Sequence, residues 1–286
     1  MTAVLFVGIV ALGAAGIALA VCRLVIPGAP ARVMRRNVRG ADVPAVLGFP
    51  LAAAGLTGVV LVALVLVATS TTVIDESVAV AWVLVLMAAA GMWDDLRGDE
   101  RPRGFAGHLG ALKGRAVTGG VVKIVAAVAA GAFAAAFLPA RGASSVAHTL
   151  EVVALVGLSA NLINLLDRAP GRAAKVSFLL AIPLLALGRR GWTAAAMPVF
   201  SALAVTTYFD LREEAMLGDA GANPVGAVIG VGLAAALEEP GRIATIAVLV
   251  ALNLASERWS FSAAIEAAAP LRWFDGLGRK DQVAPK

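Results

Sequence analysis

Two adjacent carboxylates, Asp94 and Asp95, end an apolar stretch of the chain. Hard divalent cations prefer oxygen ligands, and a pair of neighbouring acids is a common way to hold Mg²⁺ beside a phosphate group. A solvated helix end is the simpler interpretation of a single acid at such a position. The pair alone is therefore only a weak indication of phosphate chemistry.

A second group of polar residues recurs every three positions, as Asn161, Asn164 and Asp167. In a helix this spacing places all three on roughly one stripe, so together they can form the wall of a polar site. Asparagines in an apolar helix also form hydrogen bonds to neighbouring helices, each worth about 1 kcal/mol. The spacing leaves both interpretations open.

The third group is a glycine-rich turn, in which Gly218 and Gly221 flank Asp219 and Pro224 follows. Proline is favoured in the first turn of a helix. Small residues let the backbone approach a ligand, and a helix start directs N–H groups and the positive end of its dipole at an anion. A plain turn is the alternative, but Gly-Asp-x-Gly at the start of an apolar helix favours a functional site.

The composition places these groups in a membrane protein. Apolar residues make up 60% of the 286 residues and charged residues 15%, against roughly 45–50% and 25% in soluble domains. We therefore expect an all-α, polytopic transmembrane helical bundle, and we exclude a secreted mini-domain, a disordered chain and an ordinary soluble enzyme. The lone Cys22 excludes an internal disulfide framework and a cysteine-based metal cluster.

Apolar runs of the length that a bilayer requires, about 20 residues each, predict the transmembrane spans. The nine expected spans lie near residues 2–22, 46–69, 78–93, 120–138, 149–166, 175–187, 193–209, 224–237 and 243–256. With these spans, most of the 24 Lys and Arg residues fall on one side, which the positive-inside rule identifies as the cytoplasm. The N-terminus is then outside, and the C-terminus and all three acidic groups are at the cytoplasmic face. Residues 1–257 form the transmembrane domain, and residues 258–286 form a cytoplasmic tail that can lie amphipathically on the membrane.

The three groups occur in a fixed order, each next to the cytoplasmic end of a predicted span. In this order they resemble the motifs of the polyprenyl-phosphate sugar-1-phosphate transferases, which include the bacterial phospho-MurNAc-pentapeptide translocase and the GlcNAc-1-phosphate transferases. The resemblance extends from about residue 36 to residue 256. It implies a multi-pass protein of the bacterial inner membrane that moves a sugar-1-phosphate from a nucleotide-sugar, with UDP as the expected nucleotide, to polyprenyl phosphate. Such a reaction serves cell-envelope glycan synthesis, including that of peptidoglycan.

The resemblance also implies roles for individual residues. Asp219 matches the family's Mg²⁺ ligand, with Mn²⁺ as an alternative ion, and Asp94 and Asp95 match an acidic pair that handles the lipid phosphate proton or the metal. The residues that it implies for substrate binding are Lys123, Asn161, Asn164 and Asp167. For Lys123 the alternative is an interfacial lysine that extends its ammonium group toward the lipid headgroups.

Two departures from the family pattern support a second interpretation. Pro170 stands where the family has a second acid after Asp167. The family's His-rich cytoplasmic loop is missing as well, because the only histidines are His108 and His148. The alternative is a non-catalytic homologue that keeps the fold and binds lipid phosphate or a membrane partner.

Other functional classes fit less well. A CDP-alcohol phosphotransferase requires two further aspartates shortly after Asp167, and residues 173–209 contain none. A transporter places ionisable residues near the middle of the membrane, whereas the acids here lie at one face. The net charge of +5 comes from basic residues near span ends, so we expect a lipid bilayer rather than nucleic acid as the partner. A homodimer is left open.

Overall fold

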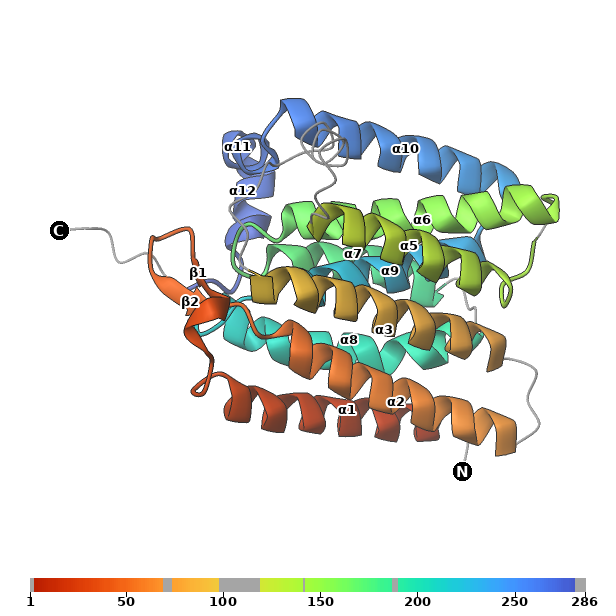
Figure 1. Ribbon diagram of the computed structural model, residues 1–286, viewed down its shortest axis with the longest axis horizontal. Coiled ribbons are helices and arrows are strands. Elements are labelled where there is room, and N and C mark those ends of the chain that lie inside the picture. Colours follow the sequence, from red (N-terminus) through yellow and green to blue (C-terminus); the bar gives the residue numbers. More distant parts are fainter. Residues whose placement is uncertain (1–2, 69–73, 98–118, 141, 187–189, 281–286) are drawn as a thin grey trace.

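The computed structural model describes residues 3–68, 74–97, 119–140, 142–186 and 190–280. Its long helices lie side by side with roughly parallel axes and form one bundle (Figure 1). In the described part of the chain these helices are α1 (Ala3–Val25), α2 (Gly48–Ala68), α3 (Ile74–Arg97), α5 (Gly119–Ala135), α6 (Ser145–Leu166), α7 (Arg172–Ala186), α8 (Arg190–Leu211), α9 (Asp219–Ala236) and α10 (Glu239–Arg258). Two short helices, α11 (Phe261–Ala267) and α12 (Ala269–Gly276), follow α10.

The structure confirms the prediction of an all-α membrane bundle. The number of spans and their orientation stay predictions. A helix overlaps each of the nine predicted spans. Among the described helices five, namely α1, α2, α3, α6 and α8, are long and apolar enough to cross a membrane, and α5 is a shorter apolar helix. His108 lies outside the described residues, and so do the basic residues at 98–118 that we assigned to the cytoplasmic side. The end of the tail, at 281–286, is not described either.

The outer faces of the helices are apolar as well. Large aliphatic side chains are exposed there, for example Leu12, Leu64, Ile182 and Leu254. Apolar surface of this extent indicates contact with lipid or with a partner. A lipid bilayer is therefore the environment in which this bundle is stable.

Helix α9 runs through the bundle and is buried along nearly its whole length. It packs against α3 and against α6. Gly226 and Gly230 face α6, where a β-carbon would collide with the backbone of Ser159 and Leu155. Small residues at such positions let two helices pack backbone to backbone, as is common in membranes.

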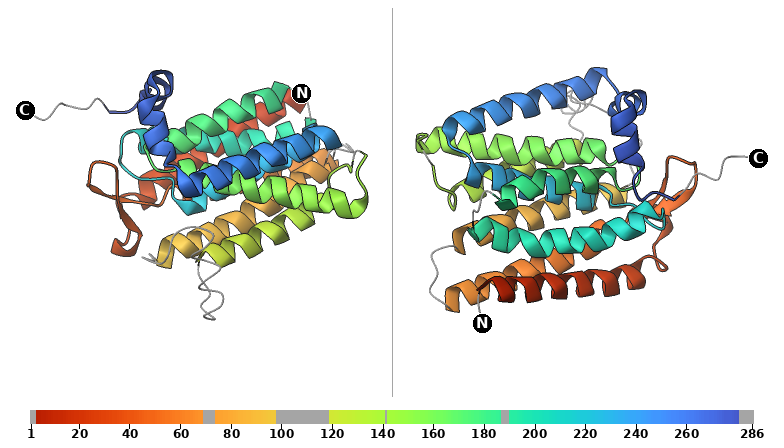
Figure 2. Two further views of the ribbon diagram at one scale, coloured as in Figure 1. Left: turned by 90° about the horizontal axis from the view of Figure 1, so that it is seen from above. Right: turned by 180° about the vertical axis from the view of Figure 1, so that it is seen from behind.

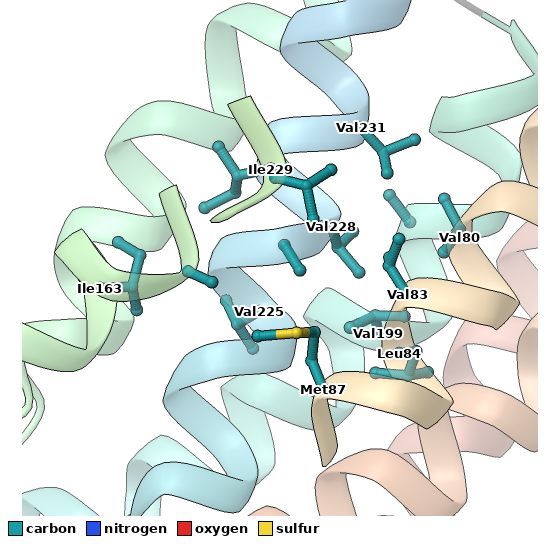
Figure 3. Close-up of a cluster of buried hydrophobic side chains, with 14 of the residues drawn as sticks. Val80, Val83, Leu84, Met87, Ile163, Val199, Val225, Val228, Ile229 and Val231 are labelled. Atoms are coloured by element: carbon teal, nitrogen blue, oxygen red, sulfur yellow. The ribbon is translucent and has the colours of Figure 1, made fainter. Parts of the chain in front are cut away.

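A cluster of aliphatic side chains fills the space between α9 and the helices around it (Figure 3). The labelled members are Val80, Val83, Leu84 and Met87 of α3, Ile163 of α6, Val199 of α8, and Val225, Val228, Ile229 and Val231 of α9. Lipid tails are as apolar as these side chains, so the cluster stabilises the bundle through close packing. The packing fixes the start of α9 against the end of α3.

Polar contacts attach helix α10 to α6 at two levels along the bundle. Near one end of the bundle, the buried Arg242 Nε lies 2.6 Å from Glu151 Oε2, and the same guanidinium donates to two backbone carbonyl oxygens. Further along, Asn161 Nδ2 donates to Asn253 Oδ1 at 2.6 Å. Removing one partner of a buried ion pair is strongly destabilising, so these contacts hold α10 in place.

A small hairpin and the two short helices gather at one end of the bundle, opposite the N-terminus (Figures 1 and 2). The hairpin consists of the 3-10 turn η1 (Ala31–Val33) and two antiparallel strands, β1 (Met34–Arg36) and β2 (Asp42–Pro44). Helices α3 and α6 end here and α9 begins here (Figure 1). The three predicted acidic groups therefore lie at the same end of the molecule.

Candidate functional site

Three charged side chains from three helices meet at this end of the bundle. The Lys123 ammonium Nζ, on α5, lies 2.6 Å from Asp94 Oδ2 of α3 and 2.5 Å from Asp219 Oδ2 of α9. The side chains of Lys123, Asp94 and Asp219 are 20%, 24% and 23% exposed. The cluster is therefore largely buried, with less than a quarter of each side chain exposed.

Two glycines permit this close approach. A β-carbon at Gly91 would collide with the backbone of Asp219, and one at Gly119 would collide with the carboxylate of Asp94. The end of α3 and the starts of α5 and α9 come together because these two positions lack side chains. Neither glycine was predicted to shape the site.

Asp95 uses its carboxylate to cap α9. Its Oδ1 accepts a hydrogen bond from the Asp219 N–H at 3.2 Å, and its Oδ2 accepts one from the Ala220 N–H at 2.9 Å. A carboxylate at a helix start satisfies free N–H groups and interacts favourably with the helix dipole. Gly218, which precedes Asp219, has a positive φ of 68° that glycine adopts without strain. Asp95 thus sets the position of Asp219.

Asp167, which follows the last residue of α6, reaches the same turn. Its carboxyl group lies near the N–H of Gly218, which favours the ionised form of the carboxyl group. Burial raises the pKa of Asp167 well above its usual value, and the neighbouring charges of Asp210, Asp219 and Asp95 raise this pKa further. The three predicted acidic groups therefore converge on the turn before α9.

A cavity of about 230 Å³ opens beside Asp167. It is lined by Asp167, Arg168, Ala169 and Pro170 after α6, by Asp210 in the last turn of α8, by Glu213, Ala215 and Met216 between α8 and α9, and by Arg36, Asn37, Val38 and Val43 of the hairpin. The exposed lining of the cavity is mostly apolar, with carboxyl and arginine groups among the apolar side chains. A ligand that has an apolar face as well as a few polar groups suits such a lining, because the polar side chains can orient a ligand that the apolar ones bury.

Two acids of this cavity were not predicted as site residues. Asp210 Oδ2 accepts a hydrogen bond from the Gly171 N–H at 2.8 Å. Glu213 has a left-handed φ of 57°, and its carboxylate contacts Asn37 Nδ2 at 2.7 Å and Arg39 Nη2 at 2.8 Å. Non-glycine residues in this conformation are strained and cluster at functional sites. Both acids were visible in the sequence, but the pairing of Glu213 with a distant hairpin and of Asp210 with the loop after α6 was not.

The two asparagines before Asp167 have other neighbours. The Asn161 amide donates to Asn253 of α10. This is an interhelical hydrogen bond, one of the two interpretations that the sequence allowed for the asparagines. Asn164 accepts a hydrogen bond from the Asp167 N–H through its backbone carbonyl at 3.1 Å. The described lining of the cavity includes neither of them. Substrate binding by these asparagines stays a prediction, and the contact to α10 favours a structural role for Asn161.

Asp94 and Asp219 are the residues that fit a divalent cation, because their oxygens already converge on one cation, the ammonium group of Lys123. Mg²⁺ is commonly bound through one or two carboxylates, with water and substrate phosphates as its other ligands. Within the described ranges, no group of three or more His, Cys, Asp or Glu side chains is arranged to hold a metal. An ion at this position would therefore share its coordination with a ligand.

No protein-family model and no curated protein sequence matches the chain. The chemistry is therefore inferred from the cluster itself. An ammonium group and two carboxylates that fit a cation meet at one partly exposed point. With a divalent cation held by the two carboxylates, such a combination would neutralise phosphate oxygens, which the binding or transfer of a phosphoryl group requires.

Proposed function

We propose that the protein is an integral membrane transferase that moves a sugar-1-phosphate from a UDP-linked sugar to polyprenyl phosphate, for cell-envelope glycan synthesis such as that of peptidoglycan. The observation that carries this proposal is the position of Lys123 between Asp94 and Asp219 at one end of an apolar bundle. A membrane-held phosphate and a soluble nucleotide-sugar meet at such an interface. Phosphoryl transfer depends mainly on positioning and charge neutralisation, which these side chains supply.

We place the cluster at the cytoplasmic face of a bacterial inner membrane. In this topology the helices α1 to α3 and α5 to α10 all cross the bilayer, and the N-terminus is outside. The hairpin arginines Arg35, Arg36 and Arg39 lie at the same end of the bundle as the cluster, which supports this orientation because basic residues gather on the cytoplasmic side. Helices α5 and α7, with 17 and 15 residues, would need tilt or local thinning of the bilayer.

In the proposed reaction, an oxygen of the lipid phosphate forms a bond to the phosphorus that carries the sugar. The bond from this phosphorus to the nucleoside monophosphate breaks, and UMP leaves. The lipid phosphate is mainly dianionic at neutral pH, since its second pKa is about 6, so it needs little help from a base. Lys123 would hold donor phosphate by its charge, and Asp94 and Asp219 would hold Mg²⁺ or Mn²⁺. A bound divalent cation supplies charge neutralisation at the diphosphate.

The cavity beside Asp167 is the proposed place for the nucleoside of the donor. Arg36 and Arg168 line it and are suited to phosphate oxygens. Pro170 offers no side-chain acceptor where the resembling family has a second acid. Asp210 presents a buried carboxyl group to the same cavity, and we propose that it takes over this role.

One observation favours the alternative, a non-catalytic homologue that binds lipid phosphate or a membrane partner. Lys123 contacts both Asp94 and Asp219, so the cluster holds together without a ligand. A protein that had lost catalysis would retain such a cluster for its contribution to stability. The two functions differ in product, because only the transferase releases UMP.

The test incubates the purified protein with undecaprenyl phosphate, Mg²⁺ and a panel of UDP-sugars, and measures UMP. We expect release by the wild type and by Asp75→Asn, a control acid in the first turn of α3. Asp219→Asn should lower release by about a hundredfold or more without lowering the amount of folded protein. Equal turnover by Asp219→Asn contradicts its assignment as a metal ligand. Binding of lipid phosphate without UMP supports the non-catalytic homologue.

A further inference from the structure

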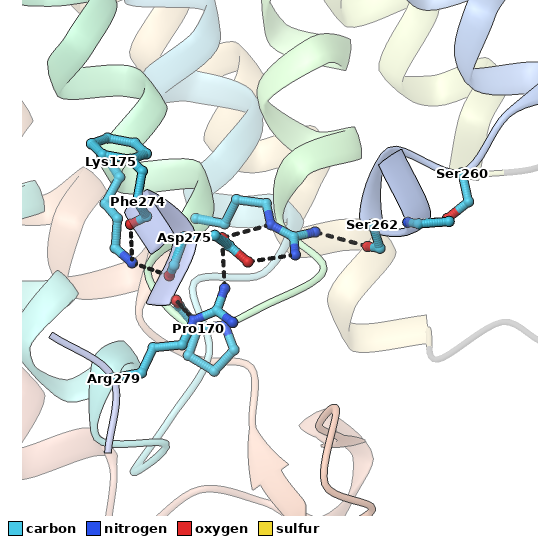
Figure 4. A network of polar contacts seen from close by, with 9 residues as sticks. Pro170, Lys175, Ser260, Ser262, Phe274, Asp275 and Arg279 are labelled. Carbon is cyan, nitrogen blue, oxygen red and sulfur yellow. Dashed lines mark hydrogen bonds and ion pairs between the residues drawn. The ribbon is translucent and has the colours of Figure 1, made fainter. Parts of the chain in front are cut away.

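The C-terminal segment after α10 is anchored to the bundle by a network of charged groups (Figure 4). Arg172, at the start of α7, donates from Nε to Asp275 Oδ1 at 2.9 Å and from Nη2 to Asp275 Oδ2 at 2.8 Å. Its third nitrogen, Nη1, donates to Ser262 Oγ at 2.8 Å. Arg279 Nη2 lies 2.7 Å from Asp275 Oδ1, and Lys175 donates to the backbone carbonyl of Asp275. One carboxylate on α12 thus binds two arginines from different segments.

The anchor is both buried and charged. The side chains of Arg172 and Asp275 are only 8% and 7% exposed. Burial alone would raise the pKa of Asp275, but the hydrogen bonds and charges of Arg172 and Arg279 lower it below its usual value. The carboxylate therefore stays ionised at neutral pH. Bidentate arginine–carboxylate pairs of this kind have a strict geometry, so α12 is held in one position.

The same segment contacts two walls of the cavity beside Asp167. On one side, Arg279 Nε donates to the carbonyl oxygen of Pro170 at 3.0 Å, and Pro170 lines the cavity. On the other side, Arg39 of the hairpin donates from Nη2 to the carbonyl oxygen of Lys280 at 3.0 Å. Arg39 also contacts Glu213, another lining residue. Residues 275–280 therefore connect the loop after α6 with the hairpin.

We infer that the C-terminal segment is a strap that positions both walls of the donor cavity, with Asp275 and Arg279 as its positioning residues. The inference rests on the proposed function in one respect, because it takes the ligand of the cavity to be a nucleotide. Coupling of this kind is reciprocal: a ligand that fits the strapped cavity stabilises the docked segment, and release of the segment lowers ligand affinity by the same factor. Asp275 and Arg279 do not belong to the charged cluster of Asp94, Lys123 and Asp219, so we expect the strap to affect binding of the donor and not the transfer step.

The first arm of the test needs no substrate. Cys22, the native cysteine, is fully buried, so an Ala169→Cys variant places a reactive thiol in the cavity wall against a low background. In the Ala169→Cys protein, adding Asp275→Asn should speed maleimide labelling by about fivefold, because the wall then opens more often. The matched control is Glu266→Gln, which changes an exposed acid of α11. Equal labelling rates in the Asp275→Asn and Glu266→Gln proteins overturn the strap.

The second arm measures the donor. Arg279→Gln should raise the Kd for UDP and the KM for the UDP-sugar about tenfold while kcat changes by less than about twofold. Arg279→Lys keeps the charge and should recover part of the affinity. Arg258→Gln, at an exposed arginine in the last turn of α10, is the matched control and should leave KM unchanged. A purely structural role would instead lower kcat and the melting temperature together, with no change in KM.

The two arms separate failure of the inference from failure of the proposed function. If the wild type neither binds UDP nor releases UMP, the transferase proposal fails, and the labelling arm still decides whether the strap holds the wall. If the wild type and Arg279→Gln bind UDP equally well, the strap does not position the donor cavity, and the transferase proposal stands.

Discussion

The N–H of Asp219 donates a hydrogen bond to Asp95 Oδ1 at 3.2 Å, so a residue in the last turn of α3 caps the helix that Asp219 begins. Its neighbour Asp94 instead contacts Lys123. Two adjacent acids therefore have different partners: one holds the start of α9, and the other lies in the charged cluster. The position of Asp219 beside Lys123 depends on both.

Replacement of Asp95 tests the capping role. Asp95→Ala removes the acceptor of two N–H groups and should lower the free energy of unfolding by about 1–2 kcal/mol. It should also lower UMP release about tenfold or more, because a displaced Asp219 no longer holds the reactants in place. Asp95→Asn keeps one acceptor oxygen and should lose less of both. Thermal unfolding in detergent and the UMP assay measure the two effects. If Asp95→Asn unfolds like the wild type but loses as much UMP release as Asp219→Asn, then Asp95 takes part in the chemistry itself.

Replacement of Lys123 tests whether a divalent cation and the ammonium group compete for the same oxygens. In Lys123→Met, the carboxylates of Asp94 and Asp219 lose the cation between them, so Mn²⁺ should bind more tightly than in the wild type. UMP release should nevertheless fall about a hundredfold or more, because the charge that holds donor phosphate is gone. Titration followed by electron paramagnetic resonance measures Mn²⁺ binding. Arg212→Met, at a half-exposed arginine just after α8, is the control, and unchanged Mn²⁺ affinity in Lys123→Met argues against a shared site.

The raised pKa of Asp167 predicts a pH dependence of stability. Burial, the main cause of the shift, makes the folded state hold this proton more tightly than the unfolded chain, whose pKa is about 3.9. The neutral Asp167 carboxyl group therefore makes its full contribution to the stability of the fold below about pH 3.9. This contribution is lost as the pH rises through the raised pKa and the buried group becomes charged. Asp167→Asn stays neutral, so it should melt higher than the wild type at about pH 8 and lose this advantage toward about pH 4. A difference in melting temperature that does not change with pH would rule out this source of instability.

The topology predicts the sidedness of four positions. Reporters fused after Arg97, Arg168 and Lys286 should be cytoplasmic, and a reporter fused after Ser77 should be external. The physical reason is the segregation of basic residues to the side on which the acidic groups lie. Enzymatic reporters that are active on only one side of the membrane measure this directly. An inverted result at Arg97 or Arg168 would separate the acidic groups and remove the common active face.

The sequence by itself determined that the chain is an all-α membrane bundle and that its three acidic groups lie at helix ends. A bilayer imposes its thickness and polarity on every segment separately, so each apolar run could be recognised without its neighbours. The positions of Asp94, Asp167 and Asp219 at the ends of such runs were predictable for the same reason. That all three reach the turn before α9 agrees with the expectation of one common face.

Only the tertiary structure decided which partner each polar group has. Asp95 caps α9, Asn161 binds α10, and Asp210 lines the cavity with a hairpin from the other end of the chain. These contacts depend on how each helix is rotated about its axis and how closely its neighbours approach, as at Gly91. Packing between segments far apart in the sequence sets both quantities, and local spacing carries no information about either. The link between Asp275 and the cavity wall is also a contact of this kind, because Arg279, which pairs with Asp275, donates to the backbone carbonyl of Pro170 in the loop after α6.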